Sequence, residues 1–103
     1  MTDSEFAELM FQEGYVATKL HSGEWLGVRR MAYTTALVIG LDETGYRCRW
    51  CYETTDDAVK AWLKWNGEGD APPGPWVKQK GRDSTGRAVD RLNPRLADPE
   101  AEF

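Results

Sequence analysis

Two neighbouring segments decide the predicted fold: Tyr-Thr-Thr-Ala-Leu-Val-Ile-Gly-Leu at residues 33–41 and Tyr-Arg-Cys-Arg-Trp-Cys-Tyr at residues 46–52. The first segment is β-branched and apolar on both faces, which is typical of a central strand covered on two sides. Residues 42–45 (Asp-Glu-Thr-Gly) have the composition of a hairpin loop. The sequence therefore predicts an antiparallel hairpin at the centre of the chain.

The second segment alternates cleanly, so its side chains are expected to point to opposite faces of the sheet in turn. If Leu41 pairs with Tyr46 across the loop, Ile39 faces Cys48 and Leu37 faces Trp50. That side is the predicted main core. The other side then places Arg47 and Arg49 beside Gly40 and Val38.

Two amphipathic helices are expected on either side of this hairpin. Residues 3–13 follow a capping box formed by Thr2 and Glu5, and Gly14 is a natural stop. Residues 54–66 begin at the N-cap Thr54 and end before Gly67. The core is expected to unite apolar residues of the hairpin and the second helix: Leu37, Ile39, Trp50, Tyr52, Val59, Trp62 and Leu63.

Residues 15–20 and 24–31 indicate two further strands, separated by the turn His-Ser-Gly. The predicted fold class is therefore α+β: a three- or four-stranded antiparallel sheet packed with two helices, in the order helix, strands, helix. Residues 1–77 are expected to form this single domain. Trp76, which follows a Pro-rich link, is expected to fold back on the edge of the core.

Residues 78–103 carry few large hydrophobic side chains and many charges, so a mostly disordered C-terminal tail is predicted. The whole chain has a formal net charge of −4. This balance disfavours non-specific binding to nucleic acid. No apolar run approaches the ~20 residues of a membrane span, and the acidic N-terminus lacks the pattern of a signal peptide. The expected location is the bacterial cytoplasm, with no membrane contact and with both cysteines as free thiols.

No convergent set of catalytic or metal-binding residues is evident. Cys48 and Cys51 form a lone C-x2-C, and zinc needs about four ligands. The predicted helix begins after both cysteines, whereas a reactive C-x2-C thiol sits at a helix N-terminus. His21 lies in a turn with nothing to position it as a base. The sequence thus predicts no enzyme, no metal and no cofactor.

Basic residues supply the candidate binding site. Arg47 and Arg49 share a face in the alternating pattern, and Arg29 or Arg30 could join them from the neighbouring strand. Clustered guanidinium groups suit phosphate or carboxylate recognition. The competing interpretation is that they pair with nearby acids or cover the sheet with their stems.

The predicted tail offers a second basic set beside an aromatic side chain: Trp76, Lys78, Lys80, Arg82 and Arg87. Such a set could follow a nucleic-acid backbone and stack a base. Three acids at the end of the chain, Asp98, Glu100 and Glu102, argue instead for a solvated tail.

A motif run extends over residues 24–88. It comprises Gly-Tyr-Arg-Cys-Arg-Trp-Cys-Tyr at 45–52, Trp-Asn-Gly-Glu-Gly at 65–69, Trp76 and Thr-Gly-Arg at 85–87. This pattern resembles a group of short, uncharacterised phage and prophage proteins with a GY…RWCY core, a helix ending in W-[DN]-G-x-G and a W…TGR tail. The resemblance implies a phage or mobile-element origin and carries no activity or site residues. The acidic end departs from the more basic tails of that group.

The expected function is therefore that of a small, non-enzymatic binding protein that acts on a macromolecular partner, most simply a protein. One possible role is inhibition of a host nucleic-acid-handling or defence complex, by analogy with other small acidic phage proteins. The alternative is a nucleic-acid-binding module that uses the sheet arginines and the basic tail. The oligomeric state is left open.

Overall fold

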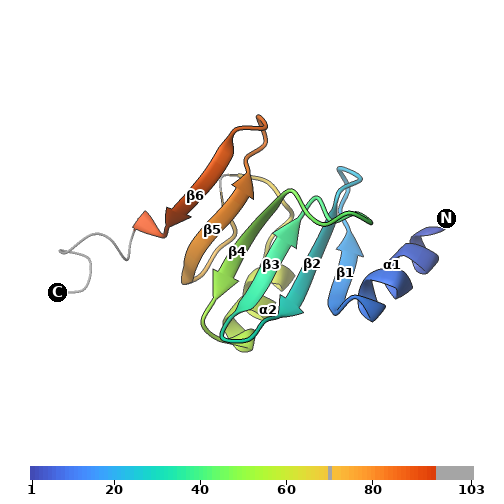
Figure 1. The fold of residues 1–103 in the computed structure, drawn as a ribbon, viewed down its shortest axis with the longest axis horizontal. Helices are drawn as coiled ribbons and strands as arrows, with labels where there is room; N and C mark the ends of the chain where they lie inside the picture. Colours follow the sequence, from blue (N-terminus) through green and yellow to red (C-terminus); the bar gives the residue numbers. More distant parts are fainter. Residues whose placement is uncertain (70, 95–103) are drawn as a thin grey trace.

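The computed structural model describes residues 1–69 and 71–94, and within these ranges the strands form one antiparallel sheet in sequence order, β1-β2-β3-β4-β5-β6 (Figure 1). The α+β class is confirmed, but the sheet has six strands rather than three or four. The elements are α1 (Asp3–Gln12), β1 (Tyr15–Lys19), β2 (Trp25–Arg30), β3 (Thr35–Ile39), β4 (Cys48–Tyr52), α2 (Thr55–Lys64), β5 (Trp76–Arg82) and β6 (Ala88–Leu92).

The central hairpin has the predicted register. Leu37 pairs with Trp50, and Ile39 pairs with Cys48. Tyr46 departs from the expectation, because it precedes β4 and packs on the opposite side of the sheet from Cys48. Regular alternation therefore begins at Cys48 and not at Tyr46.

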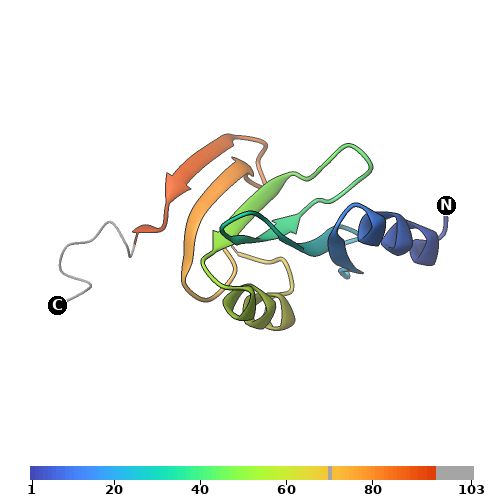
Figure 2. The same ribbon diagram turned by 60° about the horizontal axis from the view of Figure 1, so that its bottom comes forward.

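The helices lie on opposite faces of the sheet (Figures 1 and 2). α2 covers the face that carries Leu37 and Trp50, and it lies behind the strands in Figure 1. α1 packs against β1 and covers the other face, where Met10 contacts the cluster around Val38. The predicted capping box of α1 is confirmed. No helix in the described part of the chain is long and apolar enough to span a membrane.

The buried face of α2 differs from the prediction. Ala58 and Ala61 are buried, Val59 and Trp62 are half-buried, and Leu63 is 73% exposed. Leu63 follows Ala61 by two residues, about 200° around a helix with 3.6 residues per turn, so it points away from the sheet. The helix turns its small side chains to the sheet because the bulky Trp50 and Tyr52 already fill that layer.

The prediction of a disordered tail is wrong for residues 78–92. The expected division after residue 77 falls inside β5, which pairs with β4, while β6 pairs with β5. Strand pairing uses backbone hydrogen bonds, so a strand can be added with few large side chains. The buried Trp76, as predicted, anchors this hairpin to the core. The last part of the predicted tail, residues 95–103, lies outside the described residues.

Candidate functional site: a basic sheet face and a pocket

Five of the predicted binding residues share the sheet face opposite α2, and the fifth is Arg82, two residues after Lys80 in β5. Antiparallel partners point to the same side, and the pairings place Arg29, Arg49, Lys78 and Lys80 on one surface. Asp90 and Leu92 of β6 belong to the same surface. No helix lies over the β4–β6 half of this face in Figure 1. We call this surface the basic face and define it by Arg29, Arg49, Lys78, Lys80, Arg82, Asp90 and Leu92.

Like charges oppose each other at the centre of the basic face. Arg49 and Lys80 are direct partners on adjacent strands, a juxtaposition that destabilises a sheet. The Arg49 Nη1 donates to the Tyr46 hydroxyl at 2.9 Å, while its Nε is buried without a hydrogen-bond partner. Lys78 lies 3.6 Å from Asp90, so that cation is paired. Within residues 1–69 and 71–94, Lys80 forms no ion pair.

Arg29 joins the basic face and Arg30 does not. The Arg29 guanidinium lies over the Tyr15 ring, 5.4 Å from its centroid, a cation–π contact that fixes the side chain at the β2 end of the surface. Arg30 is the next residue of β2, so it points to the α2 side. Its partner Thr35 confirms this direction, because the Thr35 hydroxyl lies 2.8 Å from the hydroxyl of Thr55 in α2.

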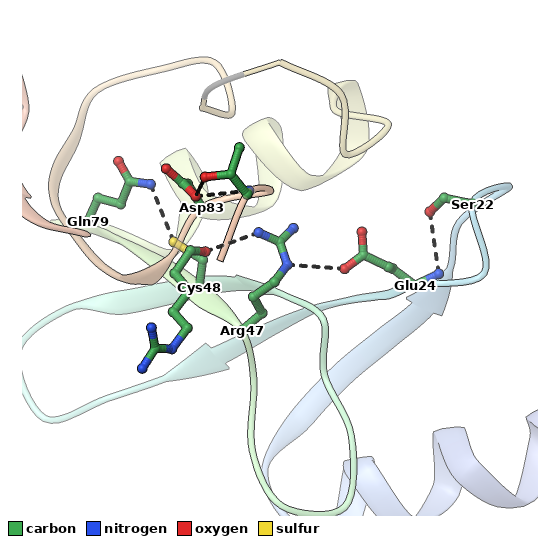
Figure 3. Close-up of polar contacts among 8 residues, drawn as sticks. Ser22, Glu24, Arg47, Cys48, Gln79 and Asp83 are labelled. Atoms are coloured by element: carbon green, nitrogen blue, oxygen red, sulfur yellow. Dashed lines mark hydrogen bonds and ion pairs between the residues drawn. The ribbon is translucent and has the colours of Figure 1, made fainter. Parts of the chain in front are cut away.

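The structure separates Arg47 from Arg49. Arg47 precedes β4 and lies next to Gly40, where an added Cβ would stand only 2.6 Å from the Arg47 Cβ. The Arg47 Nε lies 3.3 Å from the Glu24 carboxylate, and Nη1 donates to the Arg82 carbonyl at 3.0 Å. Figure 3 shows the Arg47 side chain extended between Glu24 and the β5–β6 hairpin.

A pocket of about 320 Å³ opens on the α2 side of the same strands. Arg47 and Arg82 of the predicted set are among its lining residues, but Arg82 follows Lys80 by two residues in β5, so its side chain points to the opposite face of the sheet. Arg91 of β6 also lines the pocket, and sequence reasoning missed it because it lies in the predicted tail. The Arg91 Nε donates to Gln79 Oε1 at 2.8 Å. The lining also includes Cys48, Trp50, Trp65, Gly67, Gly69, Gln79, Asp83, Ser84 and Val89.

Two predicted binding residues have other roles. Trp76 is buried with Arg91 over its ring, 5.3 Å from the centroid, so it is not exposed for stacking on a base. Arg87 lies in the β5–β6 turn, where its backbone N–H donates to the Asp83 carboxylate at 3.0 Å. The hydroxyl of Thr85 donates to the same oxygen at 2.6 Å, and these bonds hold the pKa of Asp83 below its ordinary value. An ionised Asp83 therefore shapes the turn at the pocket rim.

The thiols form no common site. Cys48 and Cys51 are free and buried, on opposite faces of β4. Cys48 accepts a hydrogen bond from Gln79 Nε2 at 3.3 Å. In the part of the chain that the structure describes, no three His, Cys, Asp or Glu side chains gather as a metal-binding set. His21 lies in an exposed turn before β2.

The comparisons with known proteins give no assignment: no family model, curated protein or solved structure matches this chain.

Proposed function

We propose that this is a non-enzymatic binding protein that docks an acidic protein partner on its basic face. The observation that carries the proposal is the direct opposition of Arg49 and Lys80 on adjacent strands. This arrangement costs stability in the free protein and is relieved when carboxylates of a partner lie between the two cations. A phage or prophage origin, and inhibition of a host nucleic-acid-handling or defence complex, are parts of the same proposal.

The composition of the surface supports a protein partner. The basic face carries five bases and one acid, a net charge of +4, although the whole chain is at −4. Leu92, 64% exposed, lies directly opposite Lys78 and adds an apolar contact. An apolar contact among charged groups resembles the core and rim of a protein interface. Such a local charge reversal would steer an acidic partner to this side of the sheet.

A nucleic acid is the second candidate, favoured by the same row of bases. It is the weaker one for two reasons. Trp76 is buried and cannot stack a base, and Asp90 neutralises Lys78 at the edge of the row. If a nucleic acid binds here, its affinity must fall steeply with salt as condensed counterions are released.

The test is capture of partners from nuclease-treated bacterial lysate, followed by identification and a binding titration with the purified partner. Arg49→Glu with Lys80→Glu is expected to abolish capture. Lys60→Glu with Lys64→Glu makes the same charge change on exposed positions of α2, on the other face, and should leave capture unchanged. Equal capture by both double variants would refute the proposal.

A parallel salt titration with mixed single- and double-stranded probes separates the second candidate. Micromolar or tighter binding at roughly 0.15 M salt, lost in the Arg49 and Lys80 variant, would make the nucleic-acid module the better account. Absence of such binding, together with the variant-sensitive capture of a protein, is the expected result.

A further inference from the structure

The turn that follows α2 contains an Asn-Gly pair, Asn66 and Gly67, which the proposed function leaves without a role. Asn66 is exposed, and Gly67 has a φ of 88°, in the left-handed region that glycine adopts without strain. In an Asn-Gly sequence the glycine nitrogen can attack the preceding side-chain amide, because glycine has no side chain to obstruct the approach. The local geometry decides whether this reaction proceeds in the folded protein.

The backbone nitrogen of Gly67 is free to act as the nucleophile. Within residues 1–69 and 71–94 its N–H donates no hydrogen bond, so no acceptor fixes its proton. The turn is closed by other donors. The Trp65 indole Nε1 donates to the Glu68 carbonyl at 2.7 Å, and the Glu68 N–H donates to the Asn66 side chain. The turn therefore keeps its shape without the Gly67 N–H.

The side-chain amide of Asn66 is held by a donor that suits the reaction. The Glu68 N–H donates to Asn66 Oδ1 at 3.0 Å, the pattern of an Asx turn. When a nitrogen attacks Cγ, negative charge develops on Oδ1. An N–H group at about 2.7–3.1 Å from such an oxygen stabilises the transition state. The turn thus polarises the electrophile and leaves the nucleophile unpaired.

The same turn covers the core beneath α2. A Cβ added to Gly67 would stand 2.6 Å from Leu20 Cδ1 and 3.2 Å from Ile39 Cδ1, so the Gly67 backbone lies directly on these two side chains. On the other side of Asn66, Trp65 meets Trp50 edge to face, with ring centroids 5.1 Å apart. A change in the length of the main chain at Asn66 would therefore disturb a segment that contacts the core.

We propose that Asn66 is a self-modification site, at which the folded protein loses the side-chain amide and acquires an isoaspartate. The Gly67 nitrogen forms a bond to Asn66 Cγ, the Cγ–Nδ2 bond breaks, and ammonia leaves with the proton of the Gly67 nitrogen. Water then opens the five-membered imide. Opening at Cγ gives aspartate, and opening at the main-chain carbonyl carbon gives isoaspartate. The reaction exchanges ammonia for water and needs no oxidant or cofactor.

The isoaspartate product loosens the turn. It adds a methylene to the main chain between Trp65 and Gly67 and places a new carboxylate there. Gly67 cannot then keep its position on Leu20 while Trp65 stays against Trp50. The aspartate product has the same charge with an ordinary main chain, so it preserves this packing. The change is slow and irreversible, and it separates old molecules from new ones by stability.

The test is peptide mapping by mass spectrometry during incubation of the protein at mildly alkaline pH, in buffer and in urea. Conversion of Asn66 in buffer is expected within about tenfold of its rate in urea, a barrier difference below about 1.4 kcal/mol. Asn93 is the internal control, because it precedes Pro94, which has no N–H to lose, and it should stay unmodified. No conversion in buffer, or a rate there more than about tenfold slower than in urea, would overturn the assignment.

The loosening of the turn has its own test. The isoaspartate form, separated by chromatography, should have a lower urea denaturation midpoint than Asn66→Asp, which carries the same charge. Asn66→Gln, incubated alongside, should keep its midpoint, because the longer side chain disfavours ring closure. Equal midpoints for the isoaspartate form and Asn66→Asp would refute the loosening. Neither measurement bears on partner capture by the basic face.

Discussion

Gly81 is the position where one added methyl group tests the β4–β5 pairing most directly. It lies in β5 opposite Cys48, with a φ of 136° that L-amino acids rarely adopt. A Cβ there would collide with the Arg47 carbonyl oxygen and would stand 2.6 Å from the Cys48 Cα. Both atoms belong to the backbone, so no side-chain rotation can relieve the clash.

The expected cost of Gly81→Ala has two parts. Holding a non-glycine residue at this φ costs about 1–3 kcal/mol, and forcing the strands apart adds about 1–3 kcal/mol. The sum, about 2–6 kcal/mol, is a large share of the ~5–15 kcal/mol that keeps a domain folded. We therefore expect a greatly lowered denaturation midpoint.

The assay is urea denaturation followed by tryptophan fluorescence. Gly45→Ala is the matched control, because Gly45 has a similar φ of 142° with no atom within 4 Å of an added Cβ. Its free energy of unfolding should fall only by the cost of the strained backbone, about 1–3 kcal/mol. If Gly81→Ala is no more destabilised than Gly45→Ala, β5 does not pair with β4 in this register and the reasoning fails.

Three further predictions follow from the core. Burial raises the pKa of Tyr52 above the ordinary tyrosine value of ~10. The buried neutral phenol therefore stabilises the fold below pH ~10, and this stabilisation is lost as the pH rises further. The tyrosinate absorbance that appears on alkaline unfolding should be smaller by one tyrosine in Tyr52→Phe. Cys48 and Cys51 should react with a thiol reagent only after unfolding, and elemental analysis should find no stoichiometric zinc; fast reaction of the native protein would contradict their burial. Trp62→Ala should cost about 2 kcal/mol, less than the ~3–5 kcal/mol of a fully buried tryptophan, whereas Leu63→Ala should stay within ~0.5 kcal/mol; the reverse order in urea denaturation would contradict the observed face of α2.

The central hairpin could be predicted because the residues that determine its register are close together in the sequence. Residues 48–52 alternate, and a short loop fixes which residues of the partner strand they face. The face of α2 was harder, because hydrophobicity alone cannot tell that the sheet accepts Ala58 and Ala61 and leaves Leu63 in solvent. That choice depends on the volume of side chains that come from other strands.

The β5–β6 hairpin was missed because few large apolar residues contribute to its stability. Apart from Trp76, β5 buries only Gln79, and most of its pairing is between backbone groups. One signal was available: residues 83–86 read Asp-Ser-Thr-Gly, a turn composition between two short segments. Since Arg91 lies in the second segment, the pocket could not be anticipated without the hairpin.

The basic face and the pocket behind it both depend on the pairing of β5 with β4. Lys80 opposes Arg49 on one side of that pairing, and Gln79 opposes Trp50 on the other. A change of register by one residue would exchange these faces and place Lys80 toward the core, so neither site would exist in its described form. Side-chain variants can therefore remove one site and spare the other, whereas Gly81→Ala weakens the pairing beneath both.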